Sequence, residues 1–473
     1  MLKRLSAADA EFYQRENTAT PMYVGSLLIL RPARDGLSSE TLLETVERGL
    51  PQVPRYRQKV RSVPFGVGRP VWVDDPAFDI TYHVRRSALP SPGTMEQLHD
   101  LVSRLAGRPL DRTRPLWEMS LIEGLADNRF ALFIKTHQTL VTGMGACEMG
   151  HLIADRSRRG GAQVADLWMP APEPDGGRLL RDAAGEWLLR PGQQVAAVRD
   201  ALLGMATNEG EFAEWVGRIG GLARRLTRGS APDSPLNATV SRHRRFTVAA
   251  AELEDYRMIR ARYDCDINDV VLTVIAGALR NWLLSREEPV NADSTIRAMA
   301  PTSVYPESQL GLASGQPIAE VAPFLIDLPV GEGNPVVRLS QISHATESWS
   351  MATMPVAAPS IVSLSGFAPP TLHAMGIRVA TRFPVRQFNL VVTNVPGPQH
   401  PMYVAGATLV EPYAVPPLLP DQVLAIGVTS YCGRLYFGIN ADRDAMSDVD
   451  VFPELLAQAL EELIDAARGP ARR

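Results

Sequence analysis

The residues best able to do chemistry stand at the end of one apolar run. Residues 130–134 are rich in β-prone side chains, and His137 and Gln138 follow shortly before the chain breaks at Gly143. This pattern predicts a buried strand that delivers polar side chains to a turn. An imidazole in such a place can act as a general base. An amide donates and accepts hydrogen bonds but has no usable basicity near pH 7.

Strands and helices alternate around this run, which predicts an α/β protein. A strand over 119–122 should pair with one over 130–138 around a turn at Asp127 and Asn128. The other elements expected in this part of the chain are strands over 22–30, 71–73 and 80–84, and helices over 39–50 and 94–105.

A second α/β block is predicted to begin near Arg245. Its expected strands are 246–248, 296–300, 324–328, 388–394, 423–431 and 434–440, and its expected helices are 251–263, 270–283, 338–350 and 451–467. Asn268 and Asp269 are expected to cap the helix over 270–283. A Pro- and Gly-rich stretch with helical patterns separates the two blocks. The predicted organisation is an N-terminal domain over 1–160, a helical connecting segment over 161–235 and a C-terminal domain over 236–473.

Composition limits the function classes. A chain of 473 residues with 45% hydrophobic and 21% charged residues is long enough for two folded domains. The net charge of −4 gives no general attraction to nucleic acid, so no nucleic-acid partner is expected. The three cysteines are far apart and fit a reducing, cytoplasmic compartment. Histidine and cysteine spacing predicts no metal site.

The N-terminus, the lengths of the apolar runs and a cluster of arginines bear on location and partners. The N-terminus has no apolar segment typical of a signal peptide, and no apolar run reaches the roughly 18 residues that span a bilayer. Contact with lipid is therefore expected from the surface. The arginines at 242, 244 and 245 are interpreted as a solvated face or a linker contact, with an anionic lipid or CoA phosphate as the alternative.

Several segments together resemble one family. His137, Thr142 and Gly143 stand as in an altered HHxxxDG motif of CoA-dependent acyltransferases. The other segments resemble, in order, landmarks of the bacterial wax ester synthase/diacylglycerol acyltransferase family: Pro115-Leu116-Trp117, Asn268-Asp269, and Asn394-Val395-Pro396-Gly397-Pro398. The resemblance extends from about residue 2 to residue 460.

The resemblance implies two chloramphenicol-acetyltransferase-like domains, each a mixed sheet with flanking helices, and a tunnel at their interface. Acyl-CoA would enter this tunnel from one side as co-substrate and the alcohol acceptor from the other, with no metal and no other cofactor. In such families the second His of the motif is the general base, the Asp is a structural partner of an Arg, and the Gly makes room for substrate.

The chain departs from the motif at two positions. Gln138 stands where the family has its catalytic His, and Thr142 stands where it has Asp, while Gly143 is retained. Because successive strand residues point to opposite faces, His137 should face away from the tunnel if Gln138 faces it. Two interpretations of His137 stay open: a packed structural residue, or a base that a twist of the loop brings into the tunnel. His151 is a further candidate for that role.

The other landmark residues also have two interpretations each. Trp117 is either a core aromatic or a wall of the tunnel. The turn with Asn394, Pro396 and Gly397 is either a stiff connection or a contact to substrate.

Two functional hypotheses follow. The first is an O-acyltransferase that moves a long acyl chain from acyl-CoA to diacylglycerol or a fatty alcohol, with weak activity. The alternative is a non-catalytic relative that binds acyl-CoA or lipid, because Gln138 replaces the catalytic His. Either protein would be cytoplasmic and would meet a membrane or lipid-droplet surface peripherally.

Overall fold

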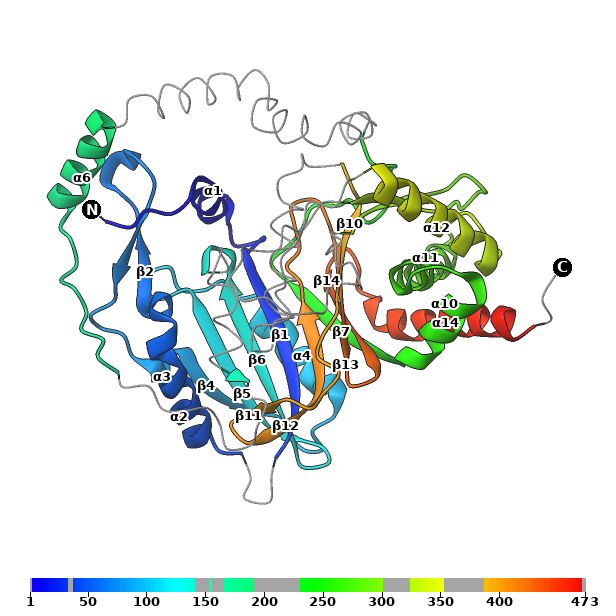
Figure 1. Ribbon diagram of the computed structural model, residues 1–473, viewed down its shortest axis with the longest axis horizontal. Helices are drawn as coiled ribbons and strands as arrows, with labels where there is room; N and C mark the ends of the chain where they lie inside the picture. Colours follow the sequence, from blue (N-terminus) through cyan, green and yellow to red (C-terminus); the bar gives the residue numbers. More distant parts are fainter. Residues whose placement is uncertain are drawn as a thin grey trace.

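Two six-stranded sheets, one in each half of the chain, organise the fold (Figure 1). The computed structural model describes residues 2–32, 37–140, 153–154, 166–189, 230–300, 324–352 and 387–469. Helices and strands are mixed in both halves, so the prediction of an α/β protein is confirmed.

The N-terminal sheet contains the run that ends in His137. Its strand order is β11–β12–β1–β6–β5–β4. The strands are β1 (Tyr23–Arg31), β4 (Val84–Ala88), β5 (Trp117–Leu125), β6 (Arg129–His137), β11 (Tyr403–Val404) and β12 (Ala407–Val415). Asp127 and Asn128 turn the chain between β5 and β6 with φ of 61° and 53°. The three strands predicted around this turn and over 22–30 are confirmed.

Helices α1 (Ala7–Arg15), α2 (Ser39–Gly49) and α4 (Met95–Ala106) begin at capping side chains. Ser38 and Thr94 each form a capping box, in which side chains and backbone N–H groups satisfy one another. The strand predicted over 80–84 is wrong in its first part. Asp79 caps a short helix, α3 (Ile80–His83), and β4 begins only after it.

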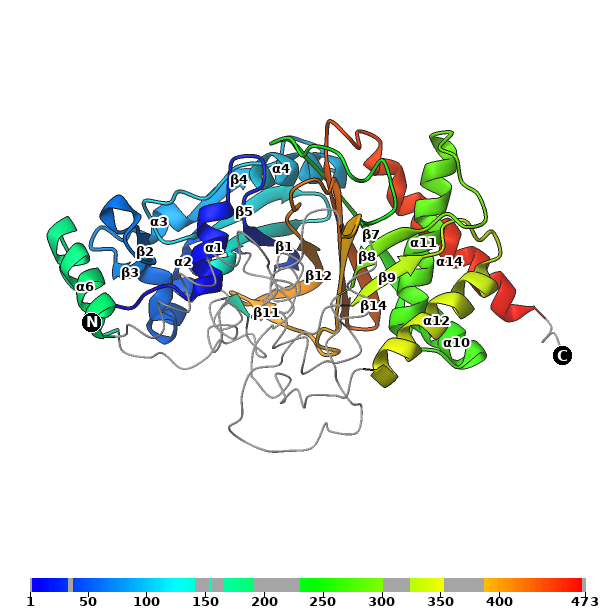
Figure 2. The same cartoon turned by 90° about the horizontal axis from the view of Figure 1, so that it is seen from above.

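The C-terminal sheet has the order β7–β14–β13–β10–β8–β9. Its strands are β7 (Arg244–Glu252), β8 (Ile296–Met299), β9 (Leu325–Leu328), β10 (Leu390–Val395), β13 (Leu424–Tyr431) and β14 (Arg434–Asp442). Its helices are α10 (Leu253–Tyr263), α11 (Ile267–Ser285), α12 (Pro335–Ala352) and α14 (Phe452–Arg468). These helices lie together on the side of this sheet that is remote from the N-terminal half (Figures 1 and 2).

Helix α11 is the buried centre of the C-terminal half. Asp266 is its N-cap, and Asp269 closes the capping box from the third helical position. Of the two residues predicted to cap this helix, Asp269 is confirmed, whereas Asn268 lies inside the first turn. By length and composition this helix is apolar enough to cross a membrane, contrary to the expectation that the chain contains no such segment. Because 72% of its apolar 18-residue stretch is buried inside the protein, we explain it as a core helix of the C-terminal half.

Strand β12 joins the two halves. It comes from the C-terminal part of the chain but pairs antiparallel with β1 in the N-terminal sheet. A Cβ at Gly25 on β1 would lie 2.8 Å from Val415 Cβ, and a Cβ at Gly438 on β14 would lie 1.7 Å from the Ala414 carbonyl oxygen. Glycines therefore let β12 pack closely against both sheets. The predicted domain boundaries stay a prediction. The structure adds that β12, from the C-terminal part of the chain, belongs to the N-terminal sheet.

A small ribbon flanks the N-terminal sheet. It consists of β2 (Gln58–Arg61) and β3 (Val71–Asp74), and α6 (Gly176–Leu189) packs on it through a separate apolar cluster. The short 3₁₀ helices are η1 (Leu50–Gln52), η2 (Pro54–Arg57), η3 (Pro64–Gly66), η4 (Gln138–Leu140) and η8 (Val449–Val451).

Candidate active site

His137 is the last residue of β6 and is completely buried. The Thr139 backbone N–H donates to His137 Nδ1 at 3.1 Å, and Thr139 Oγ1 lies 2.9 Å from the same nitrogen. A backbone N–H can only donate, so Nδ1 is an acceptor and the neutral ring carries its proton on Nε2. Nε2 lies 3.5 Å from Glu16 Oε2. The basic lone pair of His137 is therefore already used inside the protein.

Glu16 links three parts of the site. Its carboxylate accepts from the Met22 backbone N–H at 2.9 Å and from Arg112 Nε and Nη2 at 3.0 and 2.8 Å. Burial by itself would raise the pKa of Glu16. The hydrogen bond from His137, together with the bonds from Arg112 and Met22, outweighs this and lowers that pKa to about 2. Glu16 is thus a buried anion beside His137.

Gln138 follows His137 in η4 and is also completely buried. Its backbone N–H donates to the Met22 carbonyl at 2.9 Å, which ties the turn to the residue before β1. Its side chain is a neutral amide and cannot accept a proton from an alcohol near pH 7. Thr142, Gly143 and His151 lie outside the described residues, so their predicted roles stay predictions.

Trp117 lies in the core at the start of β5 and is completely buried. Its indole N–H donates to the Tyr56 carbonyl at 2.8 Å, and His83 Nδ1–H donates to its carbonyl at 2.7 Å. The imidazole of His83 also stacks on the indole, with ring centroids 4.6 Å apart. These contacts explain Trp117 as a core aromatic, as one of the two interpretations predicted. Whether it also shapes a tunnel stays a prediction.

The two later landmarks meet in the C-terminal half. Asn394 Nδ2 donates to Asn268 Oδ1 at 3.1 Å, which joins the end of β10 to the first turn of α11. The Gly397 backbone N–H donates to Ser430 Oγ at 3.1 Å, and Pro396 lies between these contacts in sequence. Asn394 therefore contacts another protein residue. The predicted substrate contacts of this turn stay a prediction.

Arg244 connects the two halves near the site, a role that the sequence did not predict. Its guanidinium is buried, bonds to the Ser241 carbonyl at 2.6 Å and to the Ala19 carbonyl, and lies 3.7 Å from the Asp442 carboxylate. The interpretation of this arginine as part of a solvated face is thus wrong, and its printed contacts lie outside the predicted connecting segment. Only its place in a cluster of arginines marked it in the sequence.

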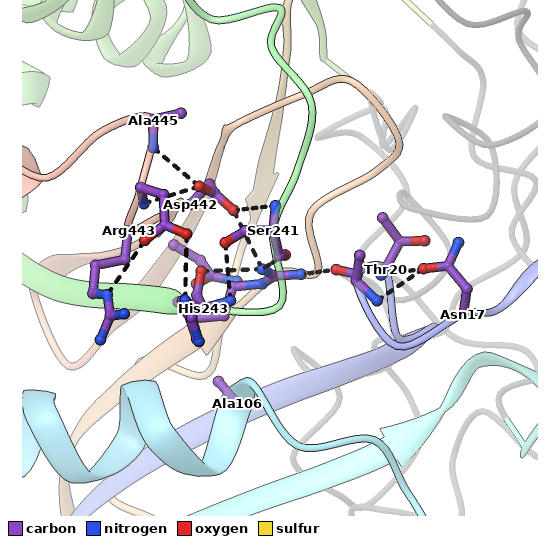
Figure 3. A network of polar contacts seen from close by, with 12 residues as sticks. Asn17, Thr20, Ala106, Ser241, His243, Asp442, Arg443 and Ala445 are labelled. Carbon is purple, nitrogen blue, oxygen red and sulfur yellow. Dashed lines mark hydrogen bonds and ion pairs between the residues drawn. The ribbon is translucent and has the colours of Figure 1, made fainter.

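Figure 3 shows this interdomain network from Asp442 and Ser241 to Asn17 and Thr20. The Asn17 side chain accepts from the backbone N–H groups of Ala19 and Thr20 at 2.8 and 2.9 Å. Residues 16–22 therefore form a loop that Arg244 holds at its middle. At one end of this loop the Glu16 carboxylate contacts His137. At the other end the Met22 carbonyl accepts from Gln138 in η4, the turn after β6, which we call the motif turn.

The motif turn supplies no free basic side chain among the described residues. In the same part of the chain, no group of three or more His, Cys, Asp or Glu side chains is arranged to hold a metal ion. What remains chemically is a buried amide, Gln138, which can orient a hydroxyl by hydrogen bonding.

Comparisons with known proteins agree along the whole chain. The model of the wax ester synthase/diacylglycerol acyltransferase catalytic domain matches residues 5–271, and the model of the C-terminal domain of the same family matches residues 320–464.

Two relatives from Mycobacterium tuberculosis match this chain. The probable diacyglycerol O-acyltransferase tgs1 of Mycobacterium tuberculosis is 30% identical over 468 residues, which cover 98% of this chain and 96% of the relative. The probable diacyglycerol O-acyltransferase tgs3 of the same species is 63% identical over 266 residues, which cover 56% of this chain and 98% of the relative.

Solved structures resemble the whole chain. The wax ester synthase/diacylglycerol acyltransferase from Marinobacter aquaeolei VT8 is 25% identical with a TM-score of 0.67, and the match covers 98% of this chain and 100% of that one. The first condensation domain of the CDA synthetase is 14% identical with a TM-score of 0.53, covers 100% of this chain and 97% of that one, and is a likeness of fold alone. The predicted pair of chloramphenicol-acetyltransferase-like domains is confirmed.

Proposed function

Because the chain belongs to the wax ester synthase/diacylglycerol acyltransferase family, we propose that it transfers a long acyl chain from acyl-CoA to diacylglycerol or a fatty alcohol. The observation that carries this proposal is the match to tgs1 over nearly the full length of both chains. In the reaction, the acceptor oxygen forms a bond to the thioester carbonyl carbon, the carbon–sulfur bond breaks, and the hydroxyl proton ends on the CoA thiol.

The arrangement at the motif supports slow turnover. Gln138 is not basic, and the Nδ1 lone pair of His137 accepts the Thr139 N–H. Loss of a positioned general base costs about 10²–10⁴ in rate. Orientation of the two substrates remains as the main contribution, with the Gln138 amide as the group that would hold the acceptor hydroxyl.

The test is an assay with labelled palmitoyl-CoA and either diolein or hexadecanol. We expect slow ester formation by the wild type and a gain of about 10²–10⁴ in Gln138→His, because an imidazole would restore the base. Gln458→His, at an exposed position of α14, is the matched control and should leave the rate unchanged. A wild type as fast as Gln138→His would contradict the proposal of slow turnover.

The second candidate is a relative that binds acyl-CoA without turning it over. The replacement by Gln138 and the occupied lone pair of His137 favour it. It predicts an inert wild type that binds palmitoyl-CoA in calorimetry, together with ester formation by Gln138→His. If neither protein forms ester or binds palmitoyl-CoA, both candidates are rejected.

The proposed substrates indicate where the protein works. We infer that the protein works in the cytoplasm at the surface of a membrane or lipid droplet, where diacylglycerol and fatty alcohols reside. Acyl-CoA is the proposed co-substrate, and no metal or other cofactor is required by the proposed reaction.

A further inference from the structure

Helix α4 forms a seam between the two halves of the molecule. It belongs to the N-terminal half, but it packs against β7, which is an edge strand of the C-terminal sheet (Figure 1). An edge strand leaves one row of backbone groups unpaired within its sheet. In this seam the Phe246 backbone N–H of β7 donates to Ser103 Oγ of α4 at 2.8 Å. The helix therefore covers the edge and supplies it with a hydrogen-bond partner.

Three residues spaced four apart, on α4 and its C-cap, line this seam. His99, Ser103 and Gly107 recur at the spacing that places residues on one face of a helix. The imidazole of His99 meets the Phe246 ring edge to face, with ring centroids 6.1 Å apart. A Cβ at Gly107 would lie 2.8 Å from the Arg242 carbonyl oxygen, so the helix approaches the chain before β7 closely. His99 is the titratable residue among these three.

His99 is poorly prepared to carry a charge in the seam. Its Nε2 atom is buried and has no hydrogen-bond partner among the residues that the structure describes. Burial lowers the pKa of His99 from 6.5 to about 4, and the smaller raising effects of Asp450 and Asp100 do not offset it. The ring is therefore neutral at pH 7, and adding a proton would bury a charge at the contact between the halves.

Charged neighbours come from three elements around His99. Asp100 follows it on α4, and Asp450 in η8 belongs to the C-terminal half. Arg245 of β7 already occupies the Asp450 carboxylate, since its Nε donates to Asp450 Oδ2 at 2.6 Å. The guanidinium thus competes with a protonated His99 for the carboxylate that could stabilise it.

We propose that His99 is an acid-sensitive switch in the contact between the two halves: the neutral imidazole lets α4 pack on β7, and its protonation separates them. This inference concerns the contact of α4 with β7 and does not depend on the proposed reaction. Opening of the seam would expose the edge of β7 that α4 covers.

The expected pH range follows from the two states of the seam. His99 binds a proton less tightly in the packed seam, with a pKa of about 4, than in an opened seam, where the pKa returns to 6.5. The seam should therefore open more often as the pH falls through this range. From these two values, opening should be about 20-fold more frequent at pH 5 than at pH 7. Glu16, whose pKa is about 2, stays ionised between these pH values.

The test is hydrogen exchange of the full-length protein at pH 7 and pH 5, followed by mass spectrometry and corrected for the intrinsic pH dependence of amide exchange. In the wild type, the peptide that contains Phe246 should open about 20-fold more often at pH 5. His99→Phe keeps a ring against Phe246 but cannot take up a proton, so this rise should disappear. His99→Gln should also lose the rise, and it serves as the second variant if His99→Phe fails to fold.

Two other histidines provide matched controls. His344→Gln, at an exposed position of α12, should keep the wild-type rise. His243→Gln should keep it as well, because His243 contacts Asp444 at 3.3 Å.

The inference is overturned if the Phe246 peptide of the wild type opens equally at both pH values, or if the variants of His99 keep the rise. It is also overturned if either control loses the rise. An equal rise in every peptide of the chain would overturn it too, because His99 would then act on the whole fold and not on the seam. No substrate is present, so none of these results bears on the proposed reaction.

Discussion

At the scale of single residues, Glu16 is a buried acid in contact with His137. The carboxylate is almost completely buried, and its neighbours lower its pKa from 4.5 to about 2. A group with a lowered folded-state pKa stabilises the protein above its unfolded pKa, and this stability is lost as the pH falls towards the folded value. The shift corresponds to about 3 kcal/mol. The site should therefore loosen between about pH 4.5 and pH 2.

Glu16→Gln is expected to lower the free energy of unfolding at pH 7 by about 3 kcal/mol, and to remove the part of the acid dependence that Glu16 causes. Urea unfolding at pH 7 and at pH 3 measures both effects. Glu11→Gln, which removes an exposed pair with Arg15 on the same helix, should change stability by only about 0.3–0.5 kcal/mol. Equal acid dependence in Glu16→Gln and wild type would show that this carboxylate is not the titrating group.

At the scale of elements, local sequence patterns predicted most helices and strands, but not which distant strands pair with one another. The strands around Asp127 and Asn128 have strong apolar runs and a turn signal, so they were found. Strand β12 was missed because Pro412 interrupts its apolar run, and its pairing with the distant β1 leaves no local signal. The 3.5 Å contact between His137 and Glu16 was missed because the two residues lie far apart in the sequence. No spacing rule connects residues that only the folded chain brings together.

Strand β12 also depends on a glycine. Gly25→Ala places a Cβ 2.8 Å from Val415 Cβ, so we expect a loss of about 1–3 kcal/mol as β1 and β12 move apart. Chemical denaturation measures this loss. Gly185→Ala in α6 is the matched control: nothing lies within 4 Å of its new Cβ, and the better helix propensity should stabilise the protein by about 0.5–1 kcal/mol. A neutral Gly25→Ala would show that the two strands pack less closely than described.

At the scale of the whole molecule, Arg244 couples the two halves. Removing one partner of a buried ion pair costs about 3–5 kcal/mol, and Asp442 would lose its cation in Arg244→Met. The loop over residues 16–22 would lose its hold from the second half. We expect one thermal transition in the wild type and two in Arg244→Met, as measured by scanning calorimetry. Arg245→Met, whose pair with Asp450 is partly exposed, should keep one transition.

The strand that β1 receives from the far end of the chain also has a consequence for biosynthesis. Residues 32–415 must be translated before β12 can pair with β1, which takes about 20–80 s at typical ribosomal rates. The other edge of β1 can pair with β6 much earlier, since both strands lie within the first 137 residues. During this interval the nascent chain presents an apolar sheet edge without its final neighbour. Such an edge is a template for aggregation, so production of this protein should depend on chaperones that bind nascent chains.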